Sequence, residues 1–234
     1  MPEGQEGNSF KEQKVNRKLS WNIHPETYHI EFNQPAIGLS VNKLLPKGWN
    51  FMYWEDDTGT VSPPDFILID PQLYSDRGLI ATLAHGIGHA RHFAEKPNEY
   101  KRLWKKQDIK DTHLQSCLTD EERIKMVCDS YNAEMQLEFE GWDRGLMVAD
   151  KLGLDSMEYE LEMNLQHESL NDHIERGIVR TSQLIKQHVK LPDNYKLNFH
   201  HLPQVNLTKG KSFITIGQLQ ELATEFVKKR PELE

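Results

Sequence analysis

The segment that most constrains this chain is a short apolar run followed by a helix that carries two histidines. The apolar run 66–69 is bounded by turn residues, which is typical of a strand. Either Ser75 or Asp76 can cap the helix that follows, whose apolar residues recur at helical spacing to about Phe93. His85 and His89 then lie within about 40° of each other on one helix face. Two imidazoles so placed can share a metal ion.

Two glycines interrupt the same helix. Gly86 and Gly88 both lie between the two histidines. Each glycine in a helix interior lowers the stability of the helix by on the order of 1 kcal/mol relative to alanine. Close packing of another element explains Gly88. The sequence supplies no such reason for Gly86.

Strands are expected before this helix and helices after it. Residues 28–32 and 50–55 have alternating or aromatic patterns that indicate strands, and with 65–70 they predict a small N-terminal sheet. Residues 96–119 predict a shorter helix plus a connection, anchored by Trp104 and Leu114. The fold class expected is therefore α+β, with a small sheet packed on a pair of helices and further helices at the C-terminal end.

Capping patterns mark the later helices. Thr119 begins a capping box, and the long helix after it ends at Gly153. A second capping box at 155–158 opens a helical stretch to about residue 189 with a break at Gly177, and a last helix follows Thr215. We predict a disordered lead-in over 1–18 and a single domain over 19–234, with a core of about 50–153 and a helical extension over 154–234.

An acidic residue on the long helix points inward and is a candidate third ligand. At about 100° per residue, Glu138 falls inside the apolar stripe of this helix, about 20° from Val127. Glu134 lies at the edge of the stripe, and Glu140 lies on the opposite face with Asp143 and Arg144, where we expect solvent. A buried carboxylate is costly without a partner or a metal. Glu138 is the first choice as ligand and Glu134 the second.

Bulk composition excludes several classes of function. The formal net charge of −8 gives no indication of nucleic-acid binding or of an anionic membrane surface. The sequence has no signal peptide pattern and no run of about 18 apolar residues, so a cytoplasmic protein is expected. Its two cysteines, Cys117 and Cys128, are expected to be free thiols.

The segment from Thr82 to His89, TLAHGIGH, resembles the active-site helix of zincin metallopeptidases of the gluzincin kind, and is similar to the ImmA/IrrE-type family. The family pattern is L-A-H-E-[IL]-G-H after a short strand. The resemblance implies one zinc ion held by His85, His89 and a glutamate on a later helix, which Glu138 matches except that Gly141 replaces the family's alanine. It also implies an edge strand that aligns an extended peptide substrate, formed here by Phe66, Ile67, Leu68 and Ile69.

The chain departs from this family at the catalytic position. Gly86 stands where the family has the glutamate that acts as general base, a role worth typically about 10² to 10⁴ in rate. The sequence therefore predicts a zinc metallopeptidase-like protein for protein or peptide substrates that is inactive or strongly impaired as it stands, by natural divergence or by an introduced change. The alternative is a pseudopeptidase that binds a partner peptide without cutting it. A helical structural protein without metal is the third possibility.

The other histidines have no motif around them. His92 is rotated about 60° from His89, away from His85, and is not expected to be a fourth ligand. The remaining candidates are expected to be solvated, although any one can act as a hydrogen-bond donor at the rim of the cleft: His113, His167, His173, His188, His200 and His201. Oligomeric state is not predicted.

Overall fold

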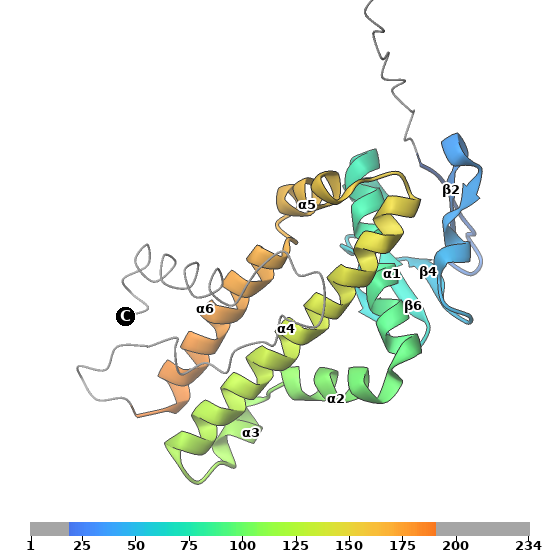
Figure 1. Cartoon of the computed structure of the whole chain (residues 1–234). Helices are drawn as coiled ribbons and strands as arrows, with labels where there is room; N and C mark the ends of the chain where they lie inside the picture. Colours follow the sequence, from blue (N-terminus) through green and yellow to red (C-terminus); the bar gives the residue numbers. More distant parts are fainter. Residues whose placement is uncertain (1–18, 191–234) are drawn as a thin grey trace, which may run out of the picture.

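A computed structural model describes residues 19–190 of the chain. The expected lead-in over 1–18, the last helix after Thr215, and His200 and His201 lie outside the described residues. Within this range the α+β class is confirmed: a six-stranded N-terminal sheet is followed by six helices. Figure 1 shows the sheet on one side of the molecule and the helices extending away from it.

The sheet has the order β1-β2-β4-β6-β5, with β3 paired to β2. Its strands are β1 (Ser20–Ile23), β2 (His29–Gln34), β3 (Leu39–Ser40), β4 (Asn50–Tyr53), β5 (Val61–Ser62) and β6 (Phe66–Ile69). Among the strands of residues 19–190, only β4 and β6 pair in parallel, and the other pairs are antiparallel. The alternation in β2 has the expected effect, because Ile30 and Phe32 are buried while Glu31 is exposed.

The prediction that Phe66–Ile69 is an edge strand is wrong. The two-residue strand β5 pairs with β6, through the register Val61↔Ile67 and Ser62↔Phe66, and so takes the edge position among the described residues. Strand β5 escaped the sequence analysis because it has too few residues for a period to be visible and is followed at once by Pro63.

The helices are α1 (Asp76–Glu95), α2 (Pro97–Gln107), α3 (Asp111–Gln115), α4 (Asp120–Lys151), α5 (Ser156–Leu165) and α6 (Leu170–His188). The three expected caps are present: the side chains of Ser75, Thr119 and Asp155 each accept a backbone N–H three residues on. The long helix α4 lies between α6 on one side and α1 and α2 on the other (Figure 1). It is therefore covered along more than one face.

Two details of the helical prediction are corrected. The C-terminal stretch does not break at Gly177, which lies inside α6; it breaks between α5 and α6, where Ser169 caps the new helix. A side chain at 177 would approach the ring of Tyr131 to 3.0 Å, so this glycine serves close packing. Trp104 is 44% exposed, and the buried anchors of α2 are Tyr100 and Leu103; Leu114 is buried as expected.

Glycines allow α1 and α4 to cross at very short distance. A Cβ atom on Gly88 would lie 2.1 Å from the carbonyl oxygen of Gly141 and 2.7 Å from the backbone nitrogen of Gly145. Any side chain at 88 would therefore push the two helices apart. The expected packing reason for Gly88 is confirmed, and this crossing brings the histidine face of α1 onto α4.

None of the helices between residues 19 and 190 combines the length and the apolar character that a bilayer crossing requires.

Candidate metal centre

The structure brings together the three residues selected as first-choice ligands. Nε2 of His85 and Nε2 of His89 lie 3.1 Å apart, and each lies 3.4 Å from Oε2 of Glu138. Their candidate ligand atoms all fall within 4.8 Å of one another, so the group can hold a metal ion. Two neighbouring helices, α1 and α4, supply the three side chains.

The surroundings fix the orientation of the two imidazoles. Gly141 leaves room for the ring of His89, because a Cβ atom there would lie 2.5 Å from that ring. On the other side of the cluster, the hydroxyl of Tyr159 lies 3.4 Å from Nδ1 of His85. An outer partner on Nδ1 favours metal binding through Nε2.

Burial and charge act in opposite directions at the cluster. Burial lowers the pKa of His85, although the Glu138 carboxylate opposes this effect. The lowered pKa favours the neutral imidazole that a metal requires. Burial alone would raise the pKa of Glu138, but His173 and His89 lower it well below its usual range. Oε2 of Glu138 makes no regular hydrogen bond to any described residue. A negatively charged oxygen is thus held among imidazoles without a protein donor at normal distance.

A third histidine, which the sequence analysis placed in solvent, faces the same carboxylate. Nε2 of His173 lies 3.4 Å from Oε2 of Glu138 and 3.2 Å from Oε2 of Glu168. Its side chain is only 14% exposed. Burial lowers the pKa of His173, but Glu138 and Glu168 raise it above its usual value. The prediction of a solvated His173 is therefore wrong.

The helical angle that selected Glu138 does not select His173. At about 100° per residue, His173 lies about 60° from Leu170 and about 100° from Ile174, outside the arc that these two buried residues define. The helical extension thus contributes to the site, through Tyr159 on α5 and His173 on α6.

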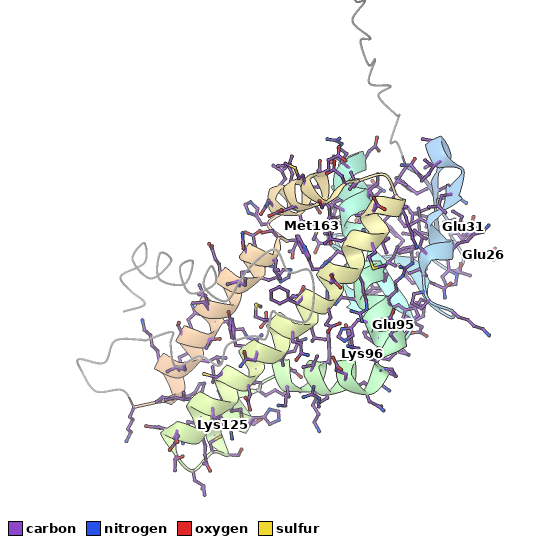
Figure 2. All side chains as sticks on the ribbon, in the orientation of Figure 1. Glu26, Glu31, Glu95, Lys96, Lys125 and Met163 are labelled. Atoms are coloured by element: carbon purple, nitrogen blue, oxygen red, sulfur yellow. The ribbon has the colours of Figure 1, made fainter. Side chains whose placement is uncertain are left out.

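The cluster opens into a cavity of about 200 Å³. One wall is the segment 58–61 that leads into β5, and the other walls come from α1, α4, α5 and the start of α6. Met163 of α5, labelled in Figure 2, lines the cavity together with His173 and Glu168. The sheet edge that faces the metal cluster is therefore β5 and the segment before it.

Gly86 lies beside the cluster but faces the sheet. A Cβ atom at this position would lie 3.2 Å from Cγ2 of Ile67, which is fully buried in β6. The expectation that packing gives no reason for a glycine at 86 is corrected, because the helix approaches the strand closely there. A side chain at 86 would require Ile67 to move by a few tenths of an ångström.

Two other candidates stay outside the cluster. Glu134, the second-choice ligand, lies with one oxygen 3.3 Å from Nη1 of Arg180 and is not part of the metal group. His92 is fully buried and lies 3.8 Å from Glu99, also apart from it.

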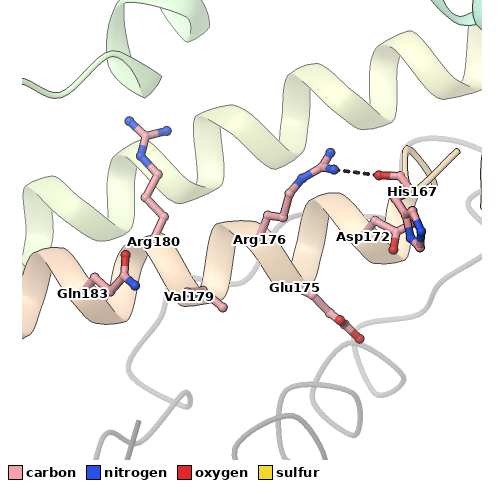
Figure 3. Close-up of a pocket in the computed structure, with 7 residues that line it drawn as sticks. All are labelled: His167, Asp172, Glu175, Arg176, Val179, Arg180 and Gln183. Carbon is pink, nitrogen blue, oxygen red and sulfur yellow. Dashed lines mark hydrogen bonds between the residues drawn. The ribbon is translucent and has the colours of Figure 1, made fainter. Parts of the chain in front are cut away.

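The outer face of α6 carries a second cavity, of about 450 Å³, drawn in Figure 3. Arg176 donates to the carbonyl oxygen of His167 at 2.6 Å and to Oε2 of Glu168 at 2.9 Å. The guanidinium thus holds the carboxylate that faces His173. Arg176, which lines this cavity, is therefore linked to His173 through Glu168.

No protein-family model, curated protein or solved structure matches this chain.

Proposed function

We propose that this chain is a zinc-binding protein of the metallopeptidase type that holds an extended peptide at the metal and turns it over poorly. The observation that carries the proposal is the convergence of Nε2 of His85, Nε2 of His89 and Oε2 of Glu138 at 3.1 to 3.4 Å. Two imidazoles and one carboxylate are a typical donor set for catalytic zinc, which keeps its fourth position for water or substrate.

The spacing of the three atoms supports zinc as the ion. Ligands at about 2.0 to 2.1 Å from zinc in a tetrahedral arrangement lie about 3.3 Å from one another. The three separations of 3.1, 3.4 and 3.4 Å agree with this value. Zinc held here would polarise a carbonyl group and lower the pKa of bound water.

The cavity supports a peptide as ligand. It lies beside a sheet edge, β5, that no other described strand covers. A peptide in extended form can add to such an edge by main-chain hydrogen bonds. A carbonyl group of the added strand would then lie next to the three ligands.

Poor turnover follows from Gly86, which has no group that can take a proton from metal-bound water. The second candidate function, a binder that does not cut, is favoured by the close contact at this position, since Ile67 fills the space that a larger residue would use. The two candidates share the metal and the peptide, and differ only in chemistry.

The test has two stages. Purified full-length chain should contain one zinc ion by elemental analysis, and His85→Ala should lose it; a zinc content well below one ion per chain that His85→Ala leaves unchanged would refute the proposal. Gly86→Glu is then compared with the wild-type chain on a proteome-derived peptide library. We expect cleavage to rise by about 10² to 10⁴.

Gly86→Ala is the matched control, because it adds the Cβ atom beside Ile67 without adding a carboxylate. Cleavage by Gly86→Glu but not by Gly86→Ala supports the peptidase. Retention of zinc by Gly86→Glu without cleavage of any peptide supports the non-cutting binder.

A further inference from the structure

An aromatic pocket lies beside the metal cavity along the same sheet edge. It has a volume of about 510 Å³, within the range of ligand sites. Its apolar walls come from β5, β6, the end of α1 and α2. The side chains on which the argument depends are Val61, Leu68, Phe93, Tyr100, Lys101 and Trp104.

The aromatic side chains that line the pocket pack against one another but leave the pocket open to solvent. The rings of Tyr100 and Trp104 are stacked, with centroids 6.1 Å apart and planes 13° from parallel. Phe93 meets Tyr100 edge to face at 5.4 Å. Yet Trp104 remains 44% exposed, although it is large and apolar. An exposed aromatic side chain that lines a preformed pocket is typical of a binding site.

The pocket and the metal cavity share two lining residues. Thr60 and Val61 line both. Because the backbone N–H of Leu68 donates to the carbonyl oxygen of Thr60, Thr60 faces β6. Neighbouring residues of a strand direct their backbone groups to opposite sides, so those of Val61 face the open edge. A peptide paired with Val61 would span both cavities.

The lining residues along this segment show how far apart the two contacts lie. Residues 58–61 line the metal cavity and residues 60–64 line the aromatic pocket, so the midpoints of the two stretches lie two to three residues apart in the chain. A bound strand therefore reaches the aromatic pocket two to three residues away from the residue at the metal.

We propose that this aromatic pocket selects a large apolar side chain, two to three residues from the bond held at the metal centre, in a peptide that lies along β5. The inference rests on the proposed peptide-binding function and adds the class of residue recognised. Lys101, whose ammonium group lies 5.7 Å from the centre of the Phe93 ring, disfavours Lys or Arg in the same place.

The experiment uses the full-length chain and fluorescein-labelled nonapeptides of Ala, Ser and Gly in which a single Phe occupies each position in turn. Binding is followed by fluorescence anisotropy with and without added zinc chloride. One Phe position should bind about tenfold or more tightly than the same peptide with Ser there, the range expected for burying this side chain.

Trp104→Ala should reduce this Phe preference about tenfold or abolish it. Trp54→Ala is the matched control, because Trp54 is also exposed but does not line the pocket. Lys101→Glu provides a second variant on an exposed side chain, and it should improve binding of a peptide with Arg at the selected position a few-fold. The proposal is overturned if no Phe position binds more tightly, or if the preference survives Trp104→Ala.

Three further outcomes separate this proposal from others. If Trp104→Ala changes a dimer into a monomer in light scattering, a second copy of the chain occupies the pocket and the proposal is wrong. Zinc binding and cleavage without any Phe preference would remove this inference but keep the proposed function. A Trp104-dependent Phe preference in a chain that binds no zinc would do the reverse.

Discussion

Glu138 and Glu140 lie two residues apart on α4, and their surroundings differ in one respect. Glu140 is held by cations of the protein: its Oε1 lies 3.6 Å from Nζ of Lys96, and Arg144 donates to it and to Glu95. Figure 2 labels Glu95 and Lys96 at the end of α1, where this ion-pair cluster lies. Glu138 is surrounded by three imidazoles instead.

The two carboxylates differ in the kind of group that faces them. The ion-pair cluster balances its own charges, because permanently charged groups face the carboxylate. The imidazoles around Glu138 present lone pairs as well as protons. Two acidic residues on the same helix thus have different partners: Glu140 is paired with cations of the protein, and Glu138 belongs to a group that can hold a metal ion.

The variant with the largest expected effect should disrupt the surroundings of Glu138 and of Glu140 together. Gly88→Ala places a Cβ atom against the carbonyl oxygen of Gly141, and the crossing of α1 and α4 must open. We expect a loss of about 3 kcal/mol or more in the free energy of unfolding, measured with urea. Gly86→Ala, whose nearest contact is a side chain at 3.2 Å, should cost less. Equal losses in the two variants would contradict the close crossing.

The next variant tests the role of Glu138 separately from that of Glu140. Glu138→Gln removes a charged ligand and should weaken zinc binding by more than about 100-fold, the upper range for outer-shell changes, because Glu138 would contact the ion itself. Glu140→Gln is the matched control and should leave zinc affinity unchanged. Isothermal titration with zinc measures both. A similar loss in both variants would show that charge on α4, and not ligation, governs the affinity.

A pH titration probes the ion-pair cluster, to which fully buried His92 belongs. The pKa of His92 is lowered to about 4, chiefly by burial. Glu140 raises this pKa, whereas Arg144 and Lys96 lower it further. Nε2 of His92 lies 3.8 Å from Oε1 of Glu99. The unfolded chain binds this proton more readily, so stability is complete above about pH 6.5 and falls as the pH drops towards 4. The loss between pH 7 and pH 5 should be about 2 kcal/mol.

Urea unfolding at the two pH values measures this loss, and His92→Gln, which cannot titrate there, should reduce it. An unchanged pH dependence in His92→Gln would assign the effect to other groups.

The smallest effect concerns the orientation of a ligand. Tyr159→Phe removes the hydroxyl that lies 3.4 Å from Nδ1 of His85. This distance is long for a hydrogen bond, so we expect the lower end of the outer-shell range, about tenfold in zinc affinity. Unaltered affinity would mean that packing alone orients His85.

The sequence was informative where one stripe of a helix faces one partner. The helical angle placed Glu138 inside and Glu134 at the margin, and both positions agree with the structure. It failed for Glu140 and Arg144, which were expected in solvent but are 20% and 14% exposed. Because α4 is covered by helices on several sides, a single-stripe argument cannot separate its second buried face from a solvated one.

The sequence pattern did not reveal a two-residue strand or contacts between residues that are far apart in the chain. Nothing in the two residues of β5 distinguishes a strand from a loop, so the wrong strand was assigned to the edge. His173 was missed because its partners, Glu138 and Glu168, lie on another helix and in the connection before α6. Such contacts are set by how the helices dock and not by spacing along the chain.

The glycines of the α1–α4 crossing bear on how mutational maps of this chain should be interpreted. Gly88, Gly141 and Gly145 each stand where a Cβ atom would collide, with backbone, with the His89 ring and with the Tyr159 hydroxyl respectively. In a saturation-mutagenesis scan these three positions will be as intolerant as His85, although none of them offers a ligand atom. Intolerance alone would therefore overstate the size of the metal site, and only the pairing of tolerance data with metal content would recover its true boundary.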